Sequence, residues 1–165
     1  MKIRRSGLAH SLVLLVLATM GGLAWSASGI LAGPLTSNIN LPIAGTVNGA
    51  TEKVAVSGRV QIASTFVLDD LLVEPPREVI SIRLVKVTGV GLSTGATYTV
   101  TGQTVLVRPL VLSDVVELTF PLVPDAAGHA AEARSVLASL TLKFDVLRGA
   151  LTGGTARFST PSFPG

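Results

Sequence analysis

The sequence contains no cysteine among its 165 residues. Disulfide bonds, thiolate metal sites and a cysteine nucleophile are therefore excluded, as is a lipid anchor on an N-terminal cysteine. A domain without disulfides has to be stabilised by its hydrophobic core. The chain beyond its N-terminal segment is about 140 residues long, which is enough to bury one.

An excess of charge of one sign is also missing from most of the chain. The formal net charge is +3, and Lys2, Arg4 and Arg5 account for all of it. Beyond residue 27, acidic and basic residues are equal in number. A surface that binds nucleic acid needs an excess of lysine and arginine on one face. We therefore expect no nucleic-acid partner.

Residues that carry catalysis or cofactor binding are sparse and scattered. His129 is the only histidine beyond the N-terminal segment, and no serine lies in a G-x-S-x-G motif. The glycine-rich stretch 89–95 has neither the spacing nor the following helix of a phosphate-binding loop. We therefore predict a protein that is not an enzyme, with no catalytic residues and no cofactor.

One acidic cluster is the single candidate for a metal site. Asp69, Asp70 and Glu74 fall within six residues, just before two prolines. Carboxylates can hold Ca²⁺ together with backbone carbonyls, but the usual alternation of ligands with glycine is absent. We expect no metal, and keep these three residues as a weak cation candidate. They are also the only basis for a remote alternative, a secreted hydrolase.

The N-terminus has the order of a secretory signal peptide. Three positive charges in the first five residues precede the apolar run Leu12–Met20 and the segment 21–27, which is small and weakly polar apart from Trp25. We predict that residues 1–27 are cleaved and that the protein is exported from a bacterial cell, to the periplasm or beyond. An uncleaved membrane anchor is less favoured, because the stretch 8–25 is short and interrupted by polar and glycine residues.

The rest of the chain has the hydrophobic pattern of an all-β protein. Residues 28–40 show no period and are interpreted as a leader, and residues 41–165 are dominated by period-two alternation. This pattern predicts one antiparallel β-sandwich of about eight or nine strands, of immunoglobulin-like or Greek-key type. A small β-barrel is the alternative. The less obvious strands are expected at 79–88, 104–112 and 114–123, with at most a short helix at 125–134.

Three dipeptides have the composition of two-residue hairpin turns: Asn48-Gly49, Gly102-Gln103 and Gly153-Gly154. In each case apolar residues face each other across the expected hairpin. The buried positions change from even to odd numbers near Leu147–Gly149, which predicts a bulge or bend there.

Pro42 leads to the prediction of an exposed sheet edge. Its missing N–H would point away from the hairpin partner, so the strand 41–47 is expected at an edge. Ile43 and Val47 are then the interaction residues, because an exposed edge can pair with a strand of a partner or of another copy. The leading hypothesis is thus a structural or protein-interaction role in the cell envelope or outside the cell. The alternative is a binding protein for a small apolar ligand.

Overall fold

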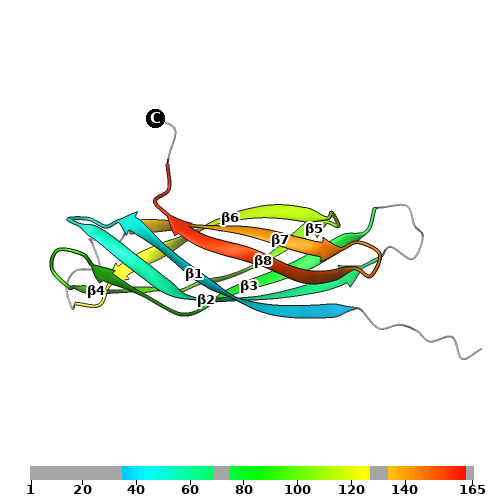
Figure 1. Ribbon diagram of the computed structural model, residues 1–165, viewed down its shortest axis with the longest axis horizontal. Helices are drawn as coiled ribbons and strands as arrows, with labels where there is room; N and C mark the ends of the chain where they lie inside the picture. Colours follow the sequence, from blue (N-terminus) through cyan, green and yellow to red (C-terminus); the bar gives the residue numbers. More distant parts are fainter. Residues whose placement is uncertain (1–34, 69–74, 127–133, 163–165) are drawn as a thin grey trace, which may run out of the picture. The chain divides into compact units, whose positions relative to one another are not determined.

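The computed structural model describes residues 35–68, 75–126 and 134–162, which form eight β-strands (Figure 1). These are β1 (Thr36–Asn48), β2 (Lys53–Val67), β3 (Arg77–Gly91), β4 (Thr97–Val100), β5 (Gln103–Pro109), β6 (Ser113–Pro124), β7 (Arg134–Asp145) and β8 (Ala150–Ser159). The expected signal peptide, His129, the acidic cluster and most of the expected short helix lie outside the described residues. Over the described part of the chain, no helix has the length and hydropathy to cross a membrane.

The eight strands form a single sheet that closes on itself. Seven strands make a ring in the order β1-β2-β3-β4-β6-β7-β8, and β5 pairs with β3 beside β4. All neighbours in the ring are antiparallel except β1 and β8, which are parallel. An odd number of strands requires one such pair, because alternating directions cannot close an odd ring.

Side chains at every second position of the strands fill the interior of this barrel. Along β2, Val54, Val56, Val60 and Ile62 are buried, while Ala55, Ser57, Arg59 and Gln61 lie outside. β3, β6 and β7 contribute buried residues in the same way. Removing a valine, leucine or isoleucine side chain from water stabilises the fold by about 1.5–3 kcal/mol. The core is therefore the main stabilising element of this cysteine-free domain.

The structure confirms an all-β fold and the small barrel that the sequence analysis gave as the alternative. The two-sheet sandwich is not confirmed, because β2 and β3 pair along their whole length and join the ends of the sheet. The strands expected at 79–88, 104–112 and 114–123 correspond to β3, β5 and β6.

The first hairpin is present, but its turn lies two residues later than predicted. The N–H of Gly49 donates to the carbonyl of Glu52 at 2.8 Å, so Ala50 and Thr51 form the turn. Val47, and not Ile43, therefore stands opposite Val54. The partner of Val54 thus shifts by four residues along β1, and an even shift keeps the same side chains on the inner face because side chains alternate with a period of two. The predicted inner face was therefore right although the register was wrong.

The predicted turn at Gly102-Gln103 is wrong. β4 and β5 do not pair with each other; they follow one another along the same edge of β3. The N–H of Leu84 donates to the carbonyl of Gly102 at 3.0 Å, so this glycine continues the ladder instead of reversing the chain. An added Cβ at Gly102 would meet the ring of Phe120 on β6, which explains the need for glycine there.

A β-bulge in β3 lies between the stretch that pairs with β4 and the stretch that pairs with β5. The pairing of β2 with β3 shifts by one residue next to Gly58, and Lys86 has a left-handed φ of 50°. A Cβ on Gly58 would lie 2.6 Å from a methyl carbon of Val87, so only glycine fits opposite the bulge. Bulges bend a strand and increase its twist. Beyond this point β4 reaches β6, while β5 does not.

The predicted turn at Gly153-Gly154 is also wrong, because both glycines lie within β8. The chain instead reverses at residues 146–149, where Gly149 has a φ of 59°. The bulge expected at 147–149 occurs further on, where Thr152 is the extra residue and donates to the carbonyl of Lys143 at 3.0 Å. Glycine allows the backbones of β8 and β7 to approach closely here, because a Cβ on Gly154 would lie 2.4 Å from the carbonyl oxygen of Thr141.

The edge position predicted for the first strand is wrong. β1 pairs with β2 on one side and, at Ala44 and Arg157, with β8 on the other. Ile43 and Val47 are each 1% exposed and belong to the core. Pro42 does point its nitrogen away from β2, but that side faces β8, where the pairing is confined to one position. The proline is tolerated by this sparse contact and does not mark a free edge.

Candidate functional site

The free edges of the sheet lie at β5 and β6. β5 pairs only with β3, and along residues 113–121 β6 pairs only with β7. Within the described residues, no backbone hydrogen bond joins these two strands. Their Cα atoms are more than 8 Å apart over nearly their whole length. Paired strands are about 4.8 Å apart. One strand inserted between β5 and β6 and paired with both would therefore hold them about 9.6 Å apart.

The hydrogen bonds between β5 and β3 show which backbone groups of β5 take no part in this pairing. The N–H of Leu110 donates to the carbonyl of Pro76 at 3.0 Å, as Leu84 does to Gly102 at the other end of the pair. Bonded pairs alternate along an antiparallel ladder, so the even-numbered residues of β5 face β3. The free N–H and C=O groups therefore belong to the odd-numbered residues Gln103, Val105 and Val107.

The same argument identifies the free groups of β6. The N–H of Phe144 donates to the carbonyl of Leu112 at 3.0 Å, so even-numbered residues face β7. The N–H and C=O groups directed toward β5 then come from Ser113, Val115, Glu117 and Thr119. We call the residues 103–109 and 113–119 together the β5–β6 edge pair.

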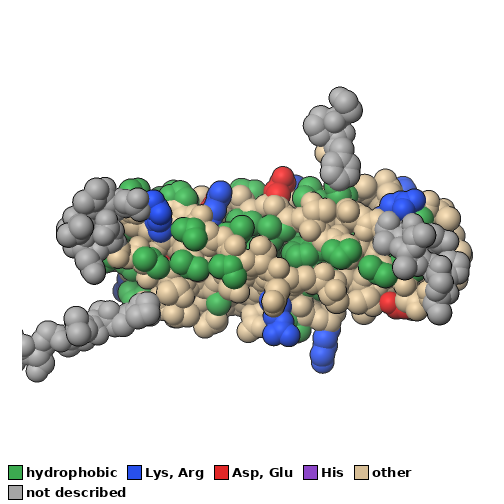
Figure 2. All heavy atoms as spheres, turned by 180° about the vertical axis from the view of Figure 1, so that it is seen from behind, with side chains coloured by type: hydrophobic (Ala, Val, Ile, Leu, Met, Phe, Trp, Pro, Cys, Tyr) green, Lys and Arg blue, Asp and Glu red, His purple; other side chains and the backbone are tan. Residues whose placement is uncertain are grey.

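The outer face of the edge pair carries three exposed valines and almost no charge. Val105, Val107 and Val115 are 63%, 59% and 58% exposed. Figure 2 shows the side of the barrel formed by β3 to β6, where hydrophobic side chains make a band across the surface. Protected edges usually carry lysine, proline or an inward charge. Here the inward charges, Arg108 and Asp114, and Pro109 are confined to the ends of the strands nearest the β5–β6 connection, and Glu117 is the only outward charge.

On the inner side an ion pair bridges the two strands. The guanidinium of Arg108 donates two hydrogen bonds of 2.8 Å to the carboxylate of Asp114. The pairing lowers the pKa of Asp114 and raises the pKa of Arg108, so both remain charged across the neutral range. Arg108 therefore joins the strands by its side chain where the backbone does not. The backbone N–H of Val115 also donates to the Asp114 carboxylate, and this contact does not involve the other edge groups.

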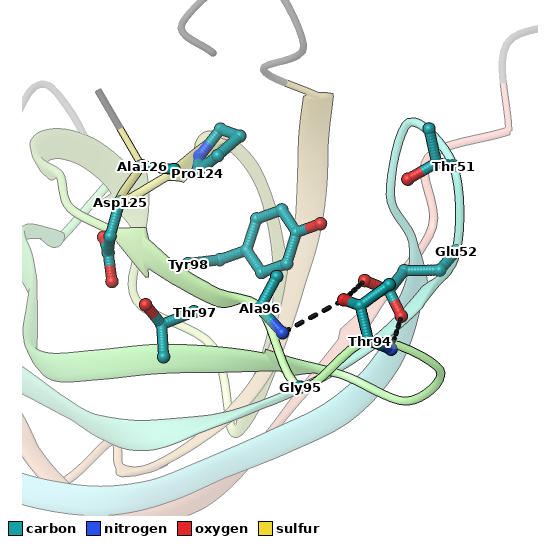
Figure 3. Close-up of a pocket in the computed structure, with 10 residues that line it drawn as sticks. All are labelled: Thr51, Glu52, Thr94, Gly95, Ala96, Thr97, Tyr98, Pro124, Asp125 and Ala126. Atoms are coloured by element: carbon teal, nitrogen blue, oxygen red, sulfur yellow. Dashed lines mark hydrogen bonds between the residues drawn. The ribbon is translucent and has the colours of Figure 1, made fainter. Parts of the chain in front are cut away.

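A pocket of about 630 Å³ lies at the end of the barrel where β4 begins (Figure 3). Its most conspicuous group, the carboxylate of Glu52, is already engaged. It accepts hydrogen bonds from the hydroxyl of Thr94 and from the N–H groups of Ser93 and Thr94, the latter two at 2.7 and 3.0 Å. The Thr94 hydroxyl and these amides lower the pKa of Glu52. Glu52 thus stabilises the β3–β4 turn, and its oxygens are occupied.

The second carboxylate of the pocket is engaged in the same manner. Asp125 accepts a hydrogen bond of 2.7 Å from the hydroxyl of Thr99. Thr99 belongs to the threonine-bearing outer face of β4, and Asp125 follows β6, so the contact stabilises the pairing that closes the barrel. The pocket is consequently lined by groups that stabilise turns and strand pairing, and we favour the edge pair as the functional site.

A buried carboxyl inside the barrel escaped the sequence analysis. Glu78 on β3 has no exposed surface, and the hydroxyl of Ser64 donates to one of its oxygens. Among the described residues its other oxygen has no hydrogen-bond partner. Burial raises the pKa of Glu78, and the bond from Ser64 opposes this in part. Glu78 has the same parity as the buried Ile80 and Ile82, a signal that could have placed it inside.

We expect Glu78→Gln to stabilise the protein at neutral pH, by about 1–3 kcal/mol. The folded state holds the Glu78 proton to a higher pH than the unfolded chain, so stability falls as pH rises between these two pKa values. The advantage of the variant should disappear below about pH 4, where the carboxyl is protonated in both states. Urea unfolding at several pH values measures this. Glu117→Gln, an exposed carboxylate on β6, is the control, and an equal gain in both variants would contradict the burial argument.

The described residues contain no group of three or more potential metal ligands. Of the residues predicted from the sequence, Ile43 and Val47 lie in the core, while Asp69, Asp70 and Glu74 lie outside the described part. Comparison of the chain with protein-family models, curated proteins and solved structures gives no match. The function is therefore inferred from the geometry of the edge pair.

Proposed function

We propose that this chain is an exported, non-catalytic β-barrel domain that binds an extended segment of a partner protein as an added strand. The observation that carries the proposal is the edge pair, two strands that do not pair with each other and whose Cα atoms are more than 8 Å apart over nearly their whole length. A segment between them would find donors and acceptors on both sides, as in other cases of β-strand addition.

The side chains around the edge pair indicate the kind of segment that fits. Val105 and Val107 on one side and Val115 on the other would flank its outward residues. On the inner side Leu106 and Leu118 are partly buried and pack against the core. A segment with small or β-branched apolar residues and little charge suits both faces.

Val105→Pro tests the proposal without removing a hydrogen bond of the fold. The N–H of residue 105 points to the open edge, so proline there removes a donor for the added strand and leaves the bonds to β3 intact. A capped peptide of alternating threonine and valine, about as long as β5, serves as the probe. We expect it to slow amide hydrogen exchange in both β5 and β6. In the proline variant its affinity should fall by roughly tenfold or more.

Val105→Thr is the matched control, because it keeps the N–H and nearly the same volume. Its affinity for the peptide should stay close to that of the original protein. Slower amide exchange in β5 alone would indicate that the added strand pairs with a single edge, as the edge strands of two copies do in a dimer. Equal binding by the proline and threonine variants would contradict strand addition at this site.

A further inference from the structure

Exposed large apolar side chains gather at one end of the barrel. β1, β3, β6 and β8 begin there, and β2, β5 and β7 end there, at the right in Figure 1. Leu147 and Leu112 are 95% and 70% exposed. We call this set of residues the apolar end: Leu35, Val67, Leu68, Val111, Leu112, Val146 and Leu147. Monomeric soluble proteins seldom expose so many apolar side chains together, and such groups mark interaction sites.

These side chains come from four separate parts of the chain. Leu147 lies on the tight turn between β7 and β8, and Leu112 lies on the short β5–β6 connection. Leu35 and Leu147 also line one shallow apolar depression of about 460 Å³. Strand ends and turns offer a partner chain no continuous edge to pair with. Apolar tips arranged in this way suit a medium that is itself continuous and apolar, such as the interfacial region of a bilayer.

The chain that precedes the barrel favours the same partner. It enters β1 through Leu35, a member of the apolar end, and it contains the apolar stretch 8–25. The residues 26–34 between them can span at most about 32 Å. During export the apolar end is therefore held close to the membrane that receives the N-terminal segment. We infer that the apolar end docks on the surface of a lipid bilayer.

The charges near the apolar end indicate which lipids it requires. Arg148 pairs with Asp145 at 3.5 Å, and Arg108 pairs with Asp114. The β2–β3 connection adds three acidic residues in sequence. Arg77 at the start of β3 and Lys143 near the end of β7 bring the basic residues at this end to four, against five acidic ones. No excess of positive charge therefore attracts anionic headgroups, and binding depends on apolar contact. Phosphatidylcholine vesicles should bind as well as vesicles that contain phosphatidylglycerol, and salt should have little effect.

Vesicle flotation of the full chain recovered from an exporting host tests this inference. Mass spectrometry first establishes the N-terminus of every sample. The test variant carries Leu112→Asn and Leu147→Asn, and the control carries Val90→Asn and Leu92→Asn at the opposite end of the barrel. We expect the original protein and the control to float with phosphatidylcholine vesicles. The affinity of the test variant for these vesicles should be lower by about tenfold or more.

Three results would overturn the inference. Flotation of the test variant equal to that of the control would assign binding to the N-terminal segment or another surface. Absence of flotation by the original protein would exclude the lipid surface. Self-association without flotation, abolished in the test variant, would make a second copy the partner. All four substitutions are at exposed positions, so equal melting temperatures show that the variants are folded.

Discussion

Ile43→Asp should prevent stable folding of the barrel, with a loss exceeding about 4 kcal/mol. Ile43 is 1% exposed and packs in the core, so the substitution places an unpaired carboxylate in an apolar interior. Small domains have a total stability of only about 5–15 kcal/mol. Far-UV circular dichroism and urea unfolding would detect the change.

The neighbouring residue provides the control for this substitution. Ala44→Asp introduces the same carboxylate one position along β1, where the side chain lies outside. We expect that variant to unfold close to the original midpoint. At the exposed edge expected from the sequence, a charge at Ile43 would instead alter the oligomeric state, because that edge was expected to pair with a partner or another copy. A folded Ile43→Asp protein with altered assembly would support that prediction and contradict the position of Ile43 in the core.

Gly45→Ala should destabilise the barrel by about 3 kcal/mol or more, although it adds a single methyl group. A Cβ on Gly45 would lie 2.1 Å from the backbone carbonyl oxygen of Phe158 in β8. Backbone atoms in a paired strand cannot move away cheaply, so the contact between β1 and β8 has to open. The midpoint of urea unfolding measures the loss.

Gly153→Ala is the matched control within the same sheet. No atom lies within 4 Å of its Cβ position, and its φ is not in the left-handed region. We expect this variant to be as stable as the original protein, or slightly more stable because alanine restricts the unfolded chain. Similar midpoints for the two alanine variants would show that β1 and β8 are not in close contact.

The sequence predicts inner faces well, because burial alone produces the alternation. Val54, Val56 and Val60 on β2 lie inside as expected, even though the β1–β2 register differs from the prediction. Closure of the sheet could not be predicted in this way. A barrel and a sandwich both bury one face of each strand, so they give the same local pattern.

The turns were harder to predict because glycine has several roles in a sheet. Asn48-Gly49 lies next to a real turn, whereas Gly102 and Gly154 make room for a neighbouring ring or backbone. Which role applies depends on contacts between residues far apart in the chain. The edge pair escaped prediction for the same reason: it results from the bulge at Lys86, whose effect on β5 is visible only once β3 is placed.

The parallel pairing of β1 with β8 has a consequence for the order of folding. The first and last strands of the chain are neighbours, and Ala44 pairs with Arg157. Contacts between residues so distant in sequence slow folding, because a long loop has to close before they form. A chain that emerges from a ribosome or an export channel N-terminus first can assemble the hairpins in turn. It cannot seal the ring until the final strand is free, so the open sheet is the longest-lived target for chaperones and proteases.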